Sequence, residues 1–436
     1  MKRLLAFVLS VATAVTLIAC NTDTGAETYP TEPEKDYSEY AGVVADPGTW
    51  YENFQNLPIA NADMTTDELR QLCVDAFKAN LTFQWTPNKE VAYTYLDAPV
   101  NLPVGMAYSG MCYAAGKYKV TAGNIHKLLY YYDRETGVLD VRAMGDKFLG
   151  IISSACSSGA IQGWNRVSNS HGLSRMESYN MFDSNIIPVG NYTYAPHIYD
   201  YNFASKTATA QIVEFNGEQT MLESYAQMLP GDGLFTSPGW HVVMCSKAPV
   251  VVRNSDGTIN AEESYITLCG QGNDGTHLSP SLIVKQENGV DLCKLGSVDY
   301  KMSFKRLLKS ANIPFTIPEF VGEDPVEPGK AWIASATSVI ENGTDLSLAQ
   351  ISTMQAHGNY NICNLIIKVT DPAGNELVSY DPSLPTLPHE FSVNLMGGFD
   401  KDKLTPYANG ENTIHINVRL ANGELIEAFK TVLKIS

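Results

Sequence analysis

Short apolar runs separated by turn residues dominate this 436-residue chain from about Gln211 onward, and they restrict that region to a strand-rich fold. The runs QIVEF, GLFT, HVVMC, VVVRN, YITLC and SLIVK follow one another, each of strand length and apolar or alternating in composition. Between them, residues 254–258 (NSDGT) carry an Asp-Gly hairpin signal. The pattern predicts consecutive strands closed by a short helix over 304–312.

A Pro- and acid-rich segment, residues 322–329 (GEDPVEPG), is predicted to link this region to a C-terminal domain. The strands expected beyond it cover 361–370, 389–395, 413–420 and 428–435, with turn residues between them and no good helix. About a hundred residues in that pattern predict an antiparallel β-sandwich of immunoglobulin type over 330–436.

The region before residue 211 is predicted to be mixed, with a helix between 58 and 85. Thr65 and Glu68 have the spacing of a capping box, and apolar residues repeat after them at helical intervals. Cys73 lies on that apolar face and is predicted to be a small buried residue. A chain of this length exceeds one ordinary core, so we expect an α+β domain over 37–321 followed by the β-sandwich.

The N-terminus predicts where the protein is located. Residues 4–18 form an uncharged apolar run behind a short basic start, too short and wrongly flanked for a transmembrane helix. The run ends in LIAC at 17–20, which resembles the bacterial lipobox and implies that Cys20 is lipidated. We therefore expect a signal peptide over 1–20, a polar tether over 21–36, and lipid anchoring in the cell envelope, on the outer membrane, periplasmic or surface face.

Charge and cysteine content exclude several classes of function. The chain has 30 Lys and Arg against 47 Asp and Glu, a net charge of −17, which argues against binding nucleic acid or a polybasic contact with membrane. Seven cysteines remain beyond Cys20, so at least one thiol stays free in an oxidising envelope. No C-x-x-C pair or Cys/His spacing fits zinc, and we expect no metal or organic cofactor.

One cysteine stands at the start of a predicted helix, in the segment SSACSSGAIQGW. The apolar positions that share a helical face are Ala160, Ile161, Trp164 and Val167. This face places Cys156 near the first turn, where amide donors and the helix dipole favour a thiolate by roughly 0.3–1 kcal/mol. Pairing with an imidazolium lowers a thiol pKa further, to roughly 3.5–7.5. Cys156 is therefore the candidate nucleophile.

A second segment of interest is LPGDGLF at 229–235, and a predicted strand that begins with a histidine follows it. Alternation along that strand predicts His241, Val243 and Cys245 on one face and Val242 and Met244 on the other. A histidine at a strand end is often only a half-exposed polar residue. Its place after the cysteine segment makes His241 the candidate base.

Together the two segments resemble the NlpC-type papain-like cysteine peptidases of the bacterial cell envelope. In that family D-C-S-G opens the nucleophile helix, and P-G-D-L-x-F-F leads a few residues later into H-V-G-I. This chain has A-C-S-S at 155–158, P-G-D-G-L-F at 230–235 and H-V-V-M at 241–244, in the same order. The resemblance covers roughly residues 90–310, where only these motifs match well, and it implies a papain-like α+β domain.

The resemblance also implies roles for individual residues. Cys156 would attack a carbonyl as thiolate, and His241 would activate it and later protonate the leaving amine. A polar residue on the neighbouring strand would orient the imidazole, with Gln271 the first choice and Thr267 the second. Tyr113 is expected to line the site, and Ser157, next to the nucleophile, to contact substrate.

The chain departs from the family at the position before the nucleophile. The family has an aspartate there that recognises the free amine of a short stem peptide, and this chain has Ala155. The departure argues against carrying over specificity for an N-terminal L-Ala, but it leaves the thiol chemistry in place. Ser158 in place of Gly and Gly233 within the P-G-D-L pattern are milder differences.

The sequence therefore predicts a cysteine peptidase or amidase acting on cell-wall-type peptides or peptidoglycan fragments, as a monomer held to the membrane by its N-terminal lipid. The Gly-rich run GQGNDG at 270–275 follows a strand but precedes no helix, so it does not predict dinucleotide binding. Two alternatives stay open. One is a non-catalytic surface lipoprotein that binds glycan or peptide on a degenerate hydrolase scaffold, and the other is an amidase acting on other acyl groups.

Overall fold

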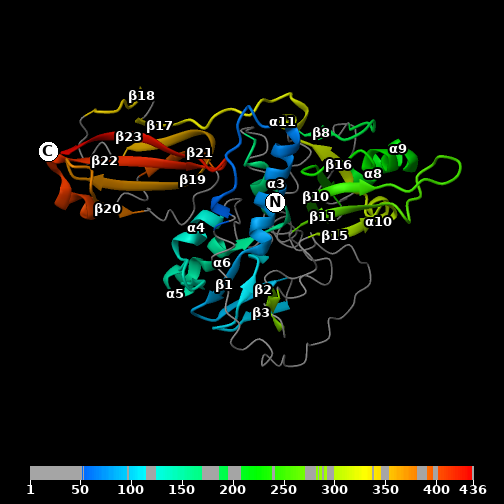
Figure 1. Ribbon diagram of the computed structural model, residues 1–436, viewed down its shortest axis with the longest axis horizontal. Coiled ribbons are helices and arrows are strands. Elements are labelled where there is room, and N and C mark those ends of the chain that lie inside the picture. The colour runs from blue at the N-terminus through cyan, green and yellow to red at the C-terminus, as the bar shows by residue number, and fades with distance from the viewer. Residues whose placement is uncertain are drawn as a thin grey trace, which may run out of the picture.

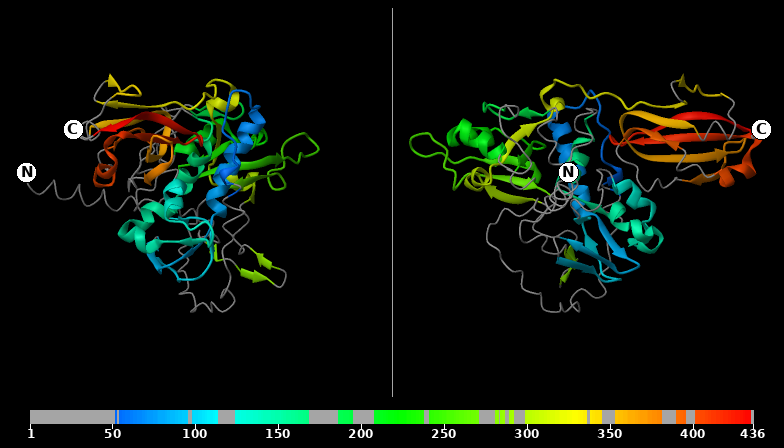
Figure 2. Two further views of the ribbon diagram at one scale, coloured as in Figure 1. Left: turned by 60° about the vertical axis from the view of Figure 1, so that its left-hand side comes forward. Right: turned by 180° about the vertical axis from the view of Figure 1, so that it is seen from behind.

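Two large β-sheets lie toward opposite ends of the molecule, and helix α3 (Thr66–Thr82) stands between them (Figure 1). The same arrangement is seen from behind in Figure 2. This combination of sheets and helices confirms the predicted α+β class. The computed structural model describes residues 52, 54–95, 98–113, 124–168, 186–194, 208–237, 241–270, 281–282, 284–286, 289–291, 299–335, 338–344, 353–380, 390–395 and 401–434.

The first sheet has six strands in the order β15-β11-β10-β9-β16-β8. Their bounds are Tyr300–Ser303, Tyr265–Cys269, His241–Val250, Gly233–Thr236, Ile313–Thr316 and Ile187–Pro188. All the pairings within it are antiparallel. The runs GLFT, HVVMC and YITLC are therefore strands, as predicted, and the helix expected after them is α10 (Phe304–Lys309).

Helix α3 covers this sheet and begins where its sequence predicts. The Thr65 side chain accepts a hydrogen bond from the Glu68 backbone N–H, and the Glu68 carboxylate accepts one from the Thr65 N–H at 2.8 Å. This confirms the capping box. Cys73 is fully buried on its inner face. Helix α7 (Cys156–Trp164) packs against α3 so closely that a Cβ at Gly163 would lie 2.6 Å from the Cys73 carbonyl oxygen, which requires glycine there.

A smaller sheet, in the order β12-β4-β1-β6, carries the second part of the core. Its strands are Ser281–Leu282, Tyr108–Ser109, Gln84–Pro87 and Val138–Leu139. Trp85, in β1, is buried, and its indole N–H donates to the Gly110 carbonyl oxygen at 2.9 Å. Around it lie the hairpin β2–β3 (Val91–Tyr95, Ala98–Leu102) and helices α4 (Asn124–Tyr130), α5 (Val141–Met144) and α6 (Phe148–Ile152).

The run QIVEF is a helix rather than the predicted strand. It lies inside α8 (Ala208–Asn216), which is followed by α9 (Glu218–Tyr225). Ala208 and Ile212 are buried one helical turn apart. The prediction was wrong because it considered five residues in isolation, and a short apolar run has no period of its own that separates a strand from a buried helical turn.

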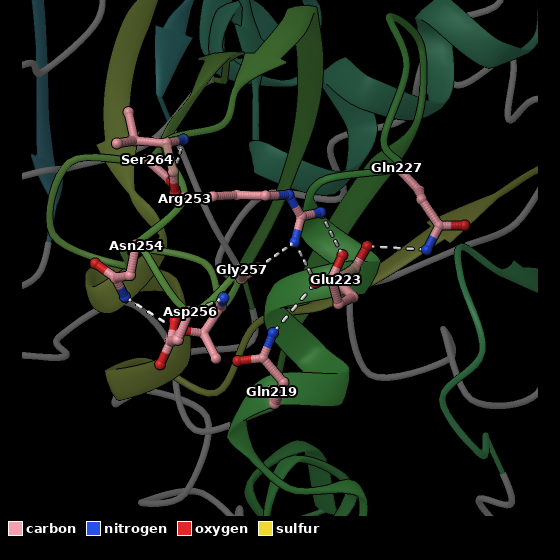
Figure 3. A network of polar contacts seen from close by, with 10 residues as sticks. Gln219, Glu223, Gln227, Arg253, Asn254, Asp256, Gly257 and Ser264 are labelled. Carbon is pink, nitrogen blue, oxygen red and sulfur yellow. Dashed lines mark hydrogen bonds and ion pairs between the residues drawn. The ribbon is translucent and has the colours of Figure 1, made fainter.

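The hairpin signal at 254–258 is a turn, as predicted, and it is tied to α9 by a polar network (Figure 3). The Gly257 N–H donates to the Asn254 carbonyl oxygen at 3.0 Å, and Gly257 has a φ of 87°. Arg253 donates two hydrogen bonds to the Glu223 carboxylate, at 2.7 and 2.8 Å. Strand β10 ends at Val250, so VVVRN is mostly connection rather than strand. SLIVK is divided between β12 and β13 (Val284–Gln286), which pairs with β14 (Gly289–Asp291).

Seven strands make up the C-terminal sheet, and all of them follow residues 322–330, where the structure has no strand. The other six are joined to β19 directly or through a neighbouring strand. Their bounds, from β17 to β23, are Ala331–Ser335, Ser338–Val339, Met354–Thr370, Glu376–Tyr380, Glu390–Asn394, Asn409–Leu420 and Leu425–Lys434. Strand β19 pairs with β17 and β21 through its first part and with β22 and β20 through its second. All four strands predicted after the linker are present, together with a one-turn helix, α13 (Lys401–Leu404), that the sequence did not predict.

A β-bulge divides β19. Ile362 pairs with Leu420 and Asn364 with Arg419, so Cys363 is an extra residue on this strand. The core-facing residues before it are Met354, Ala356, Tyr360 and Ile362, and those after it are Leu365, Ile367 and Val369. The change from even to odd positions keeps both parts of the strand packed on the same core.

The C-terminal sheet contacts the chain just beyond the end of α7. A Cβ at Gly423, in the β22–β23 turn, would lie 2.5 Å from Nη1 of Arg166. The same guanidinium donates to the carbonyl oxygens of Leu57 and Pro58, at 3.3 and 3.0 Å. Residues far apart in the chain therefore meet around one buried arginine.

Glu319, in the short helix α11 (Pro318–Val321), makes folding stability depend on pH. Burial raises its pKa from an ordinary 4.5 to about 7, more than a hydrogen bond with Ser168 lowers it. Between these values the native state holds a proton that the unfolded chain has lost, so stability falls as pH rises through that interval. Above pH 7 this ionisation lowers the free energy of unfolding by about 3 kcal/mol, at about 1.4 kcal/mol per pKa unit, and Glu319→Gln should remove that loss.

The measurement is urea unfolding at pH 4.5 and about pH 8. Relative to wild type, Glu319→Gln should gain stability at the higher pH, whereas the matched variant Glu323→Gln, one turn away on an exposed side chain, should not. Parallel pH profiles for wild type and Glu319→Gln would contradict this assignment.

Candidate active site

Cys156 is the first residue of α7, as the sequence predicts. The N-cap residue of this helix is Ala155, whose methyl side chain cannot accept a hydrogen bond from the first turn. Instead the Ala155 N–H donates to the Ser158 hydroxyl oxygen at 2.8 Å, and the Ser154 and Ser158 hydroxyls lie 3.2 Å apart. Ser158, a departure from the family pattern, therefore fixes the turn that presents the thiol. Ser157, the next helical residue, is partly exposed.

The P-G-D motif forms a buried turn that holds α7 rather than a set of reactive groups. Asp232 forms an ion pair with Arg70 at 2.6 Å, and both side chains are almost completely buried. The same arginine donates to the Pro230 carbonyl oxygen at 3.0 Å. The indole N–H of Trp164, at the end of α7, donates to the Gly231 carbonyl oxygen at 2.8 Å. This turn leads directly into β9.

His241 is the first residue of β10 and pairs with Thr236, the last residue of β9. Its side chain is partly exposed, whereas Val242, Val243, Met244 and Cys245 are buried. Because α7 packs on β10 and both faces of this strand are covered, the two predicted faces do not differ in burial beyond His241.

The Cys156 sulfur lies at the start of β10, where the backbone of the residue after His241 reaches it. The backbone N–H of Val242, the residue after His241, donates a hydrogen bond to the Cys156 thiol, and so does the Tyr113 hydroxyl. Tyr113 reaches it because β5 (Cys112–Tyr113) and β7 (Ser153–Ser154) are parallel neighbours that pair Tyr113 with Ser154. The fold therefore brings the candidate nucleophile, Tyr113 and the residue next to His241 together.

Burial changes the expected state of the thiol. Cys156 is 4% exposed, and burial raises its pKa above the ordinary value, against the hydrogen bonds from Val242, Tyr113 and Ser157 that lower it. The sequence predicted a thiolate favoured by the helix terminus. In the folded protein the thiol is instead the resting form, and a base must remove its proton. Cys112 and Cys269 are completely buried, and burial raises the pKa values of both thiols to about 12.

Other predicted site residues are placed elsewhere or are not described. Thr267, the second choice to orient the imidazole, pairs with Lys247, about 20 Å along β10 from His241, and so cannot contact the ring. Gln271, the first choice, and Cys20, the predicted lipidation site, lie outside the described residues. The Val242 N–H was missed because a backbone donor leaves no mark in the sequence.

The described residues offer no metal-binding cluster beside the Cys156 site. Among the residues that the structure describes, no group of three His, Cys, Asp or Glu side chains is arranged to hold a metal ion. In the same part of the chain, no helix is long and apolar enough to cross a membrane. The six cysteines described there, Cys73, Cys112, Cys156, Cys245, Cys269 and Cys363, are free thiols. No protein-family model, curated protein or solved structure matches this chain.

Proposed function

We propose that the protein is a thiol-dependent hydrolase, a peptidase or amidase with a papain-like domain that cleaves cell-wall-type peptides. The observation that supports it is the position of the Cys156 thiol at the first residue of a helix, hydrogen-bonded by Tyr113 and by the backbone next to His241. These are the surroundings that a nucleophile needs where its charge develops.

The geometry supports base-assisted attack. His241 takes the thiol proton as the Cys156 sulfur bonds to the substrate carbonyl carbon, and the carbonyl electrons move onto oxygen. Helix N-terminal amides, that of Cys156 among them, are suited to bind this oxyanion. The tetrahedral intermediate then breaks its C–N bond, and the imidazolium protonates the leaving amine. Water, deprotonated by His241, hydrolyses the thioester to a carboxylate and regenerates the thiol.

The remaining features of the proposal follow from the sequence. The C-terminal strands would form a β-sandwich of immunoglobulin type, which would position the catalytic domain or bind a partner by analogy with other appended sandwiches. Lipid on Cys20 would anchor a monomer in the bacterial envelope. Ala155 leaves no carboxylate at the helix cap, so the substrate would not be held there by a free amine. Gln271 would orient the imidazole.

A second candidate function is supported by the burial of the thiol. Cys156 is 4% exposed, and its raised pKa keeps it neutral at rest. A non-catalytic lipoprotein that binds glycan or peptide on the same scaffold would have no need of a reactive sulfur. The two functions therefore differ in the chemistry of one side chain.

Alkylation by iodoacetamide at neutral pH separates them. Cys363 is a matched reference because it is buried to nearly the same degree, 5% exposed against 4% for Cys156. With His241 as base, Cys156 should react about tenfold faster than Cys363, since the thiolate is the reactive form. Mass spectrometry of the modified peptides over time gives both rates in one sample.

His241→Ala provides the control. It should reduce the Cys156 rate to that of Cys363 and leave the Cys363 rate unchanged. Equal rates at the two cysteines in wild-type protein would overturn the hydrolase and favour the binding protein.

A further inference from the structure

Two buried hydroxyl groups fix the chain at the end of β9, four residues before His241. The Thr209 N–H, in the first turn of α8, donates to the Ser237 hydroxyl oxygen at 2.9 Å. In return the Ser237 N–H donates to the Thr209 hydroxyl oxygen at 3.0 Å, and the two oxygens lie 3.1 Å apart. Both residues are completely buried. The start of α8 and the end of β9 are thus joined by two reciprocal N–H bonds and by a contact between the two hydroxyls.

The pairing is reciprocal because each backbone has an N–H that regular structure does not satisfy. The first N–H groups of a helix have no partner within it, and Ser237 lies one residue beyond the end of β9. Leaving such a buried donor unpaired costs about 1–3 kcal/mol. Each hydroxyl here satisfies the other residue's N–H.

The neighbouring residue is held from the other side. The Thr236 hydroxyl donates to the Ser310 carbonyl oxygen at 2.7 Å, at the end of α10. Thr236 is also the residue that pairs with His241 between β9 and β10. The strand end opposite His241 is therefore fixed both to α8 and to the end of α10.

We propose that Thr209 and Ser237 are positioning residues for His241: their reciprocal hydrogen bonds set where the imidazole stands relative to the Cys156 sulfur. The inference rests on the proposed hydrolase for its chemical consequence. A base displaced by about 1 Å from its substrate atom can cost a hundredfold in rate. The Cys156 thiol depends on such a base because burial raises its pKa.

A second buried serine offers a matched control at the other end of β10. The Ser264 hydroxyl accepts from the Val252 N–H at 2.9 Å and donates to the Val252 carbonyl oxygen at 3.2 Å (Figure 3). Ser264 is also completely buried. Val252 is roughly 35 Å of extended chain from His241. Ser264→Ala thus removes a comparable set of hydrogen bonds without touching the end of β9 that pairs with His241.

The experiment compares Ser237→Ala, Thr209→Val, Thr209→Ser and Ser264→Ala in the full chain. Two quantities are measured, the iodoacetamide rate at Cys156 and the chemical shift of the His241 ring carbon that lies between its two nitrogens. Ser237→Ala and Thr209→Val should lower the rate about tenfold and move the resonance. Thr209→Ser, which keeps the hydroxyl, and Ser264→Ala should do neither.

The outcomes separate the inference from the function on which it rests. If Ser237→Ala and Thr209→Val behave as Ser264→Ala does in both measurements, the positioning role is overturned while the hydrolase stands. If wild-type Cys156 is unreactive but the His241 resonance still moves only in those two variants, the positioning role stands and the hydrolase is overturned. Thr209→Val has nearly the shape of threonine, so it tests the hydroxyl even if Ser237→Ala fails to fold.

Discussion

Turnover of a cell-wall peptide should fall by about 10²–10⁴-fold in His241→Ala and be lost in Cys156→Ala. General-base assistance contributes rate factors of that size. A buried thiol depends on the base more than an exposed thiol does. Burial raises the pKa of Cys156, so little thiolate forms at neutral pH without proton transfer to an imidazole. The measurement is release of the cleaved amine from peptidoglycan fragments by the full chain.

The pH profile distinguishes a lost base from a damaged fold. In His241→Ala, hydroxide must deprotonate the thiol, so the thiolate fraction grows about tenfold for each pH unit below the thiol pKa. The deficit relative to wild type should therefore shrink as pH rises. His357→Ala, which removes a partly exposed imidazole from the C-terminal sheet, serves as control and should leave turnover unchanged. A deficit that is constant with pH would contradict the role of His241 as base.

Asp232→Ala should lower the free energy of unfolding by about 3–5 kcal/mol. Asp232 and Arg70 are 2% and 6% exposed in their side chains and form an ion pair at 2.6 Å. Removing one partner leaves the other charge buried without compensation, and this is the costly case for buried ion pairs. The Asp232 carboxylate also accepts the Leu229 N–H at 2.7 Å, which keeps the P-G-D turn in shape. Urea unfolding followed by tryptophan fluorescence measures the change.

Two comparisons test whether burial causes the effect. Glu223→Ala breaks the Arg253–Glu223 pair, which is similar in length at 2.7 Å but exposed at 47% and 39%, and it should cost far less than Asp232→Ala. The double variant Arg70→Met with Asp232→Leu removes both charges and should recover part of the loss, since the Leu229 N–H still loses its acceptor. Equal effects of Asp232→Ala and Glu223→Ala would contradict the interpretation.

Local signals were predicted correctly where neighbours along the chain provide the interactions. The capping box at Thr65 and Glu68, the turn at 254–258 and the start of α7 at Cys156 all involve residues within a few positions of one another. Strands β9 and β10 were predicted because each is a distinct apolar run between turn residues. QIVEF was mistaken for a strand because five residues do not reveal a helical period.

The surroundings of the candidate site depended on contacts between distant residues. Nothing in the sequence linked Arg70 to Asp232 or Thr209 to Ser237, and Tyr113 was expected near Cys156 only through the family resemblance. The sequence favoured a thiolate at Cys156, and the structure favours the neutral thiol. A helix terminus favours the thiolate, but desolvation by the surrounding core outweighs that local effect.

The amino-acid order alone determined the α+β class, the helix on which Cys156 stands and the strand that begins at His241, because hydrogen bonding and hydrophobic periodicity act over short stretches of chain. Only the tertiary structure decided that the Val242 N–H would meet the sulfur, that the thiol would be neutral at rest, and that Asp232 would form a buried ion pair with Arg70. Burial and charge compensation depend on which distant segments pack together, and that is a property of the whole fold.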